Sequence, residues 1–160
     1  MIRIEETLTT DQPLEAVYNY VAEFAHIAQW DPGVVSSIKR QPGPLRQGDL
    51  YDITVRFGLR RIPMVYEALT VEPNKRVILR GESSTSVATD DILFETTPTG
   101  QTRLRWRADL SLLGVGAAAE PLFKPLFVRL GKKTIKALGG RLRQGLNTAQ
   151  SAATRSGVAP

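Results

Sequence analysis

The chain of 160 residues has no cysteine and a single histidine, His26. Without cysteine, disulfide bonds and thiolate chemistry are both excluded. Because zinc sites draw most of their ligands from cysteine and histidine, we expect no metal site. A Ser-His-Asp triad would need His26 as its base, and nothing near it in the sequence supports one. Nucleophilic or metal-assisted catalysis built on these residue types is therefore not expected.

Long apolar runs are also missing. No stretch approaches the roughly 18 consecutive apolar residues that a membrane-spanning helix needs. Residues 1–6 (MIRIEE) lack the apolar core of a signal peptide and are typical of a first strand. The hydrophobic fraction is 42% and the charged fraction 23%, which is ordinary for a soluble domain with a sizeable core. We therefore expect a cytoplasmic protein.

Positive charge is in excess, with a net charge of +5 and a pI of about 9.8. Such a balance raises nucleic acid and anionic membranes as partners. We do not expect nucleic-acid binding, because aromatic interleaving and known motifs are both missing. A transient contact with an anionic membrane and a homodimer stay open. Solvated faces of a helix and a strand are the simpler interpretation of the clustered cations, which are Arg129, Lys132, Lys133, Lys136, Arg141, Arg143, Arg103, Arg105 and Arg107.

The clearest pattern lies near the C-terminus. Residues 102–112 alternate polar and apolar side chains, which predicts a strand with one wet and one buried face. After the Gly-rich residues 114–116, apolar positions at helical spacing predict a long helix over about 120–147. Pro121 fits its first turn, and Pro125 should kink it or separate a short leading turn. A strand leading into a terminal amphipathic helix suggests a curved sheet closed by that helix.

The rest of the chain reads as an α+β domain with about seven antiparallel strands. A first strand precedes two short helices, of which the first has Asp11 as its expected cap and the second covers 25–29. Residues 1–147 should form a single domain and residues 148–160 a flexible tail. Turn signals separate the remaining expected strands, at 34–39, 49–57, 62–71, 76–81, 87–96 and 102–112.

Several local patterns resemble one known family. They are 10–18 (TDQPLEAVY) with 30–32 (WDP), 66–67 (YE) with 72–77 (EPNKRV), and the hairpin 94–104 (FETTPTGQTRL). With the order of elements, they resemble the START-like (SRPBCC) superfamily, in its polyketide cyclase/dehydrase and lipid-transport branch, over about residues 1–147. The resemblance implies a helix-grip fold with a cavity between sheet and helix. It does not name a function, since the family includes cyclases, dehydratases, lipid carriers and plant hormone receptors.

Strand parity gives the candidate lining of such a cavity. Side chains of one parity would meet the apolar stripe of the C-terminal helix. Trp106, Tyr51 and Tyr66 stand out, because each joins an apolar body to a polar tip that can orient a ligand. The alternative is that all these residues pack as an ordinary core. The full set of ligand-binding candidates is Trp30, Tyr51, Ile53, Val55, Tyr66, Ile92, Phe94, Trp106, Leu110, Phe123 and Phe127.

Asp90 is the acidic residue that parity places inward. A carboxyl in an apolar cavity has a raised pKa and can serve as a general acid or base, so Asp90 and Tyr66 are the catalytic candidates. The alternative is that Asp90 sits at the cavity mouth, paired or wet. Three functions follow: binding or carriage of a hydrophobic or aromatic small molecule such as a lipid or polyketide, catalysis of the aromatase/cyclase or dehydratase type, and an interaction role with a filled core.

Residues 114–119 (GVGAAA) match the dinucleotide fingerprint G-x-G-x-x-A between a strand and a helix. That fingerprint works inside a parallel strand–helix–strand unit with an acidic residue about 20 positions later. Here the preceding strands are expected to be antiparallel, and no strand follows the helix. We therefore expect no nucleotide and no other cofactor, and assign the glycines to the turn into the helix.

Overall fold

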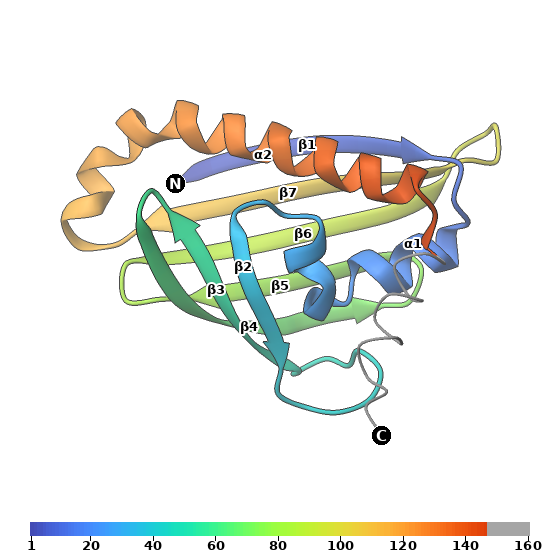
Figure 1. The fold of residues 1–160 in the computed structure, drawn as a ribbon, viewed down its shortest axis with the longest axis horizontal. Helices are drawn as coiled ribbons and strands as arrows, with labels where there is room; N and C mark the ends of the chain where they lie inside the picture. The colour runs from blue at the N-terminus through green and yellow to red at the C-terminus, as the bar shows by residue number, and fades with distance from the viewer. Residues whose placement is uncertain (147–160) are drawn as a thin grey trace, which may run out of the picture.

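A curved antiparallel sheet forms the body of the computed structural model, which describes residues 1–146. The strands are β1 (Ile2–Thr10), β2 (Val34–Lys39), β3 (Leu50–Phe57), β4 (Arg60–Glu72), β5 (Arg76–Glu82), β6 (Ser86–Thr96) and β7 (Thr102–Leu112). Their order across the sheet is β1-β7-β6-β5-β4-β3-β2, so every neighbouring pair but β1–β7 is also consecutive in sequence (Figure 1). The expected seven strands and their antiparallel pairing are confirmed.

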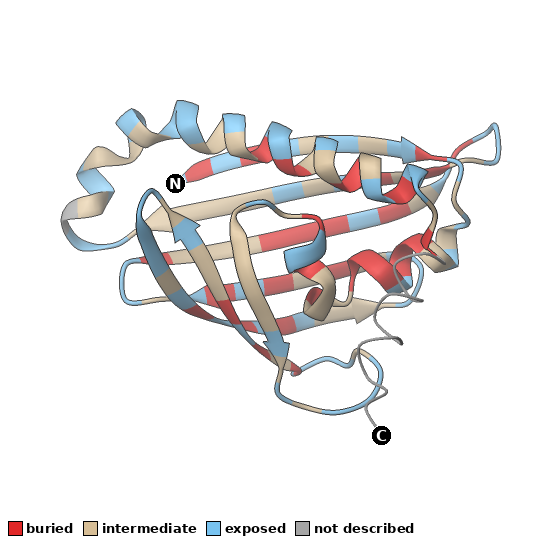
Figure 2. Cartoon of the chain, in the orientation of Figure 1, coloured by how far each residue is buried: buried red, intermediate tan, exposed pale blue. Residues whose placement is uncertain are grey.

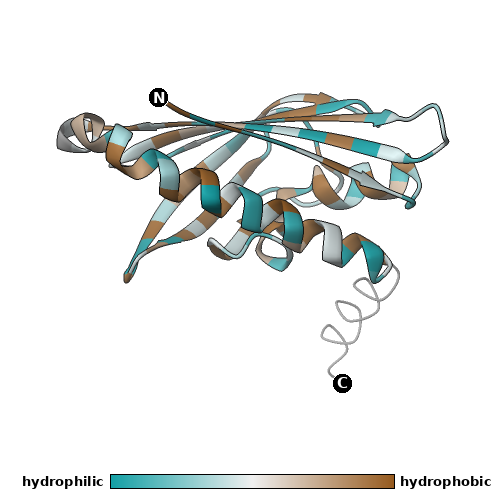
Figure 3. Ribbon diagram, turned by 90° about the horizontal axis from the view of Figure 1, so that it is seen from above, coloured by the Kyte–Doolittle hydropathy of each residue, from teal (hydrophilic) through white to brown (hydrophobic). Residues whose placement is uncertain are grey.

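The helices lie on one side of this sheet. The short helices α1 (Leu14–Val21) and η1 (Phe24–Gln29) connect β1 to β2, and η2 (Gly114–Ala119) leads into α2 (Glu120–Arg143). Figures 1 and 3 show α2 running along the sheet across β1 and β7, with α1 and η1 near its C-terminal end. This arrangement confirms the helix-grip fold that the sequence predicts.

Two local expectations need correction. Asp11 does not cap α1, which has Pro13 at its N-cap without a side-chain hydrogen bond; Asp11 instead accepts a hydrogen bond from Gln101 Nε2 at 2.8 Å. Helix α2 ends at Arg143, earlier than expected, and runs through Pro125 as one α-helix preceded by η2. Pro121 lies in its first turn as predicted. The expected tail, 148–160, lies outside the described residues.

The two faces of the sheet differ in kind. On the outer face, Arg3 pairs with Asp109 at 2.7 Å, and Asp91 holds both Arg76 at 2.8 Å and Arg107 at 3.0 Å. These cross-strand ion pairs match the expectation of a solvated basic face. On the inner face, the buried residues gather in mid-sheet, under α1 and under the C-terminal half of α2, as Figure 2 shows.

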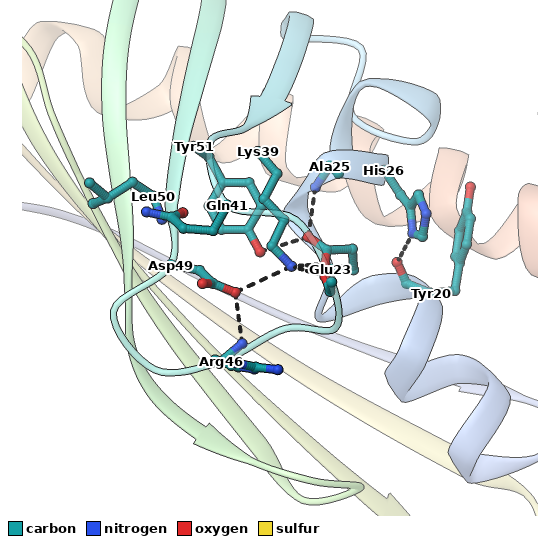
Figure 4. A network of polar contacts seen from close by, with 11 residues as sticks. Tyr20, Glu23, Ala25, His26, Lys39, Gln41, Arg46, Asp49, Leu50 and Tyr51 are labelled. Atoms are coloured by element: carbon teal, nitrogen blue, oxygen red, sulfur yellow. Dashed lines mark hydrogen bonds and ion pairs between the residues drawn. The ribbon is translucent and has the colours of Figure 1, made fainter.

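A network of ion pairs fixes η1 against β2 and β3 (Figure 4). Lys39 Nζ lies 2.8 Å from Glu23 Oε2 and 3.2 Å from Asp49 Oδ2, and its side chain is only 10% exposed. The hydroxyl of Tyr51 donates to Glu23 Oε1 at 2.6 Å, and the same oxygen accepts from the Ala25 amide. A single cation thus neutralises two carboxylates at the start of the helix that leads to the cavity residues Trp30 and Asp31.

Replacing Lys39 with methionine should lower the free energy of unfolding by about 3 kcal/mol, because two largely buried carboxylates would lose their counter-ion. Urea unfolding of both proteins measures the difference. The matched control is Arg40→Met one residue later, where the pair with Asp52 is exposed on both sides and removal should cost under about 1 kcal/mol. Equal losses in the two variants would show that the network contributes no more than a surface ion pair.

Candidate functional site

A cavity of about 810 Å³ lies between the inner face of the sheet and α2. Its apolar walls come from β3, β4 and β7 on the sheet side, and from Phe123, Phe127 and Leu130 on the helix side. Phe57 at the end of β3 closes one side by packing on Phe123 and Phe127, with ring centroids 5.7 and 5.6 Å apart. A pocket of this size and character is typical of sites for small molecules.

Most of the predicted ligand-binding residues line this cavity. Eight of the eleven do so: Trp30, Ile53, Val55, Tyr66, Trp106, Leu110, Phe123 and Phe127. The other three, Tyr51, Ile92 and Phe94, are fully buried on the same inner face but are not part of the lining. Their assignment to the cavity wall is not matched by the geometry, and ligand binding by the other eight stays a prediction.

The position of an inward-facing residue along its strand decides whether it lines the cavity or packs in the core. On β6 and β7 the residues toward η2 line the cavity, while those toward α1 are covered. Phe94 meets the ring of Tyr18 from α1 at 5.1 Å, and Tyr51 meets Phe24 from η1 at 6.4 Å. Ile92 is also part of the packed core. Helices α1 and η1 therefore cover one end of the concave inner face of the sheet and leave the other end open.

Among the described residues, Asp90 is the acidic residue that the sheet contributes to the cavity lining. It faces inward from β6 as predicted, is 7% exposed, and accepts a 2.7 Å hydrogen bond from Trp106 Nε1 on β7. Burial raises the pKa of the Asp90 carboxyl to about 7, against the lowering effect of the hydrogen bonds from Trp106 and Tyr66. Asp90 can therefore exchange a proton near neutral pH.

Tyr66 reaches Asp90 across the intervening strand. Its partner on β5 is Gly81, where a Cβ would overlap Cε2 and Cζ of the tyrosine ring. With only a hydrogen at that position, the ring can lie over β5 toward β6, where its hydroxyl interacts with Asp90. Burial, and then the charge of Asp90, raise the pKa of the Tyr66 hydroxyl, so it stays protonated. The two catalytic candidates are thus brought together.

Asp31 is a second carboxyl in the cavity, and sequence reasoning missed it. It follows η1 and was assigned to a turn, which it does form, since Oδ1 accepts from the Gly33 amide at 2.8 Å. The same oxygen accepts from Thr134 Oγ1 of α2 at 3.2 Å. Burial raises the pKa of Asp31, and its charge in turn raises the pKa of Asp90. The signal that could have found it is its place next to Trp30, a predicted lining residue.

Basic residues mark where the cavity opens to solvent. Arg56, Arg60 and Arg61 belong to the lining and are exposed, near the turn between β3 and β4. No ion pair of these three arginines is found within residues 1–146. Leu59 at the tip of the same turn is fully exposed. The rim thus combines positive charge with apolar surface.

Other sequence candidates lie away from the cavity or do not form a site. His26 stacks on Tyr20, with ring centroids 5.2 Å apart, and its Nδ1 lies 3.0 Å from the Tyr20 carbonyl oxygen (Figure 4). Residues 114–119 form η2 after an antiparallel strand, outside the setting that a dinucleotide fingerprint needs. Within residues 1–146, no three His, Asp or Glu residues are grouped to hold a metal ion, and no helix is long and apolar enough to cross a membrane.

Asp90→Asn should stabilise the protein, and more so at higher pH. The folded-state pKa of Asp90, about 7, exceeds the usual aspartate value of about 3.9. The carboxyl therefore lowers the free energy of unfolding progressively as the pH rises from about 4 to about 7. Asparagine keeps an acceptor for Trp106 and removes the buried charge. The gain in free energy of unfolding should be about 2–3 kcal/mol larger at pH 8 than at pH 5. Urea unfolding at both pH values measures it.

The control for this pH effect is Asp52→Asn, which makes the same chemical change at an exposed carboxyl. The Arg40 guanidinium lowers the pKa of Asp52, so its removal should bring no gain toward pH 8. A pH-independent effect of Asp90→Asn, or a loss at both pH values, would contradict a buried carboxyl that titrates near neutrality.

Comparisons with known proteins agree with this architecture. A START superfamily protein from Mycobacterium smegmatis superposes with a TM-score of 0.75 at 14% identity, over 90% of this chain and 99% of that one. An aromatase/cyclase from Streptomyces sp. R1128 gives a TM-score of 0.72 at 14% identity, over 89% and 93% of the two chains. At such identities the likeness shows the fold alone.

The sequence match identifies the family. Among curated proteins none matches this chain. The family model described as polyketide cyclase/dehydrase and lipid transport matches residues 1–149, which is nearly the whole chain. The chain therefore belongs to the polyketide cyclase/dehydrase and lipid transport family.

Proposed function

We propose that this protein binds a hydrophobic or aromatic small molecule, lipid-like or polyketide-like, in the cavity between the sheet and α2. The observation that carries the proposal is the cavity itself, about 810 Å³ in volume and lined mainly by apolar side chains. The volume is within the range of ordinary ligand pockets. A filled core is disfavoured, because Trp106 and Phe127 border open volume instead of interlocking.

Binding would divide between apolar burial and polar orientation. At about 25 cal/mol per Å², burial of about 300 Å² of ligand surface contributes roughly 7.5 kcal/mol before the cost of immobilising the ligand. Few polar groups face the cavity, so they would orient the ligand more than hold it. Asp90, Tyr66 and Asp31 are the candidates for that role, since each carries a polar atom in an otherwise apolar wall.

A transient contact with an anionic membrane is the proposed route of loading. Arg56, Arg60 and Arg61 would attract lipid headgroups, and the exposed Leu59 would enter the interface. Near the start of α2, Leu122 is 78% exposed and would add to the same apolar rim. An apolar ligand could then pass between bilayer and cavity without crossing water.

Catalysis of the cyclase or dehydratase type is the second candidate. It is favoured by Asp90, whose pKa of about 7 suits general acid–base chemistry, next to the protonated hydroxyl of Tyr66. Asp90 would take a proton from a carbon next to a carbonyl, and Tyr66 would hydrogen-bond the oxygen on which negative charge develops. The apolar walls would hold a flexible chain folded for reaction.

The binding proposal is tested by native mass spectrometry of the protein purified from its own host, followed by solvent extraction. The wild type should carry an apolar molecule. Ala108→Phe, which places a ring in the cavity, should abolish its retention, whereas Leu93→Phe on the outer face should not. Equal retention by both variants would contradict binding in the cavity.

The same experiment separates the two candidates through Asp90→Asn. If the protein is a carrier, any molecule that the variant retains is the same as in the wild type, in equal or smaller amount. If it is a dehydratase, the variant accumulates a precursor that is heavier by one water.

A further inference from the structure

The two cavity carboxyls come from different elements and converge on one region. Asp90 stands on β6, and Asp31 follows η1 and is held by Thr134 of α2. Each uses Oδ1 for its close hydrogen bonds, Asp90 with Trp106 at 2.7 Å and Asp31 with Gly33 at 2.8 Å. Both residues line the same cavity, and the charge of Asp31 raises the pKa of the Asp90 carboxyl. The apolar cavity therefore contains one concentrated source of negative potential.

Within residues 1–146, no ion pair joins a cation to Asp90 or Asp31, although Lys133 and three arginines line the same cavity. The groups that act on the pKa of Asp90 are Trp106, Tyr66, Asp31 and Asp109, none of them positive. Its neighbour Asp91 has two arginines on the other face of the sheet. Buried carboxylates are ordinarily paired with cations, so Asp90 and Asp31 stand out within the described part of the chain.

We propose that the cavity binds an apolar molecule that carries a protonated amine, with its ammonium group between Asp90 and Asp31. This inference rests on the proposed binding function and adds the chemical class of the ligand. An ammonium group supplies donors to the carboxylate oxygens, and charge-assisted bonds of this kind are about twice as strong as neutral ones. The indole face of Trp106 offers a further favourable contact to a cation.

The arginines at the rim do not reverse this preference. Arg56, Arg60 and Arg61 are exposed to solvent, as is Lys133, the lining cation next to Thr134 on α2. None of the four acts on the pKa of Asp90 or Asp31. Mobile ions screen exposed charges over about 8 Å at physiological ionic strength. The rim would therefore govern the approach to the cavity, while the buried pair selects among the ligands that enter.

The inference is tested with three probes that share one apolar body and differ in charge. They are 2-(2-naphthyl)ethylamine, 2-(2-naphthyl)ethanol and 2-naphthylacetate, titrated calorimetrically into the intact protein at pH 8, where Asp90 is ionised. The amine should bind at least about tenfold more tightly than the alcohol, and the acetate more weakly than both.

Two variants test whether the carboxyls of Asp90 and Asp31 cause the preference for the amine. Asp90→Asn and Asp31→Asn should each remove most of the roughly tenfold advantage of the amine. Each should change binding of the alcohol by less than about threefold. The control Asp52→Asn changes the net charge equally at an exposed position and should leave the preference intact.

The alternative outcomes are distinct. If the alcohol or the acetate binds as tightly as the amine, or if the preference survives both substitutions, the amine inference is wrong and the binding function stands. If none of the three probes binds, the result counts against both proposals.

Discussion

The distance at which α2 lies from the sheet depends on one contact. Gly131 packs directly on Ile4 of β1, and a Cβ there would overlap the isoleucine side chain. From Gly131 onward α2 is buried along its inner side, and its end is tied to the chain around α1, where Gln12 donates to the Leu142 carbonyl. Before Gly131, the large rings of Phe123 and Phe127 border open volume instead. Close packing at one end and bulky side chains at the other together leave the cavity.

The role that we propose for the buried carboxyl pair would come at the expense of stability. Burial of Asp90 and Asp31 without a cation lowers stability at neutral and higher pH, and a fold selected for stability alone would not keep it. The network around Lys39 uses the same residue types in the opposite way, with one cation between two carboxylates. That network stabilises the connection from which Asp31 extends. The two cavity carboxyls thus lack a cation partner, while the ion-pair network that fixes the neighbouring η1 has one.

Sequence patterns predicted the fold and the sheet face on which each side chain lies. They predicted less well whether an inward side chain lines the cavity or is covered by a helix. Alternation placed Asp90 and Trp106 on the inner face, because side chains in a strand change sides at every residue. It also placed Phe94 there, but the alternation does not show which end of the inner face α1 covers. It therefore could not tell that Phe94 packs under α1 and does not line the cavity. Asp31 was missed because its turn role explains the residue fully at the level of sequence. The role of Gly81 could not be predicted from the sequence, because it depends on the ring of Tyr66, which packs over it from the neighbouring strand.

Ligand binding as proposed here requires that the space between α2 and the sheet is open and apolar. A crystal of the protein pressurised with xenon tests it most directly, because xenon enters apolar cavities and is located by its anomalous scattering. We predict xenon between Trp106 and Phe127, with the rings in the positions described here. An interior without xenon, in which these rings interlock and fill the space, would contradict the account.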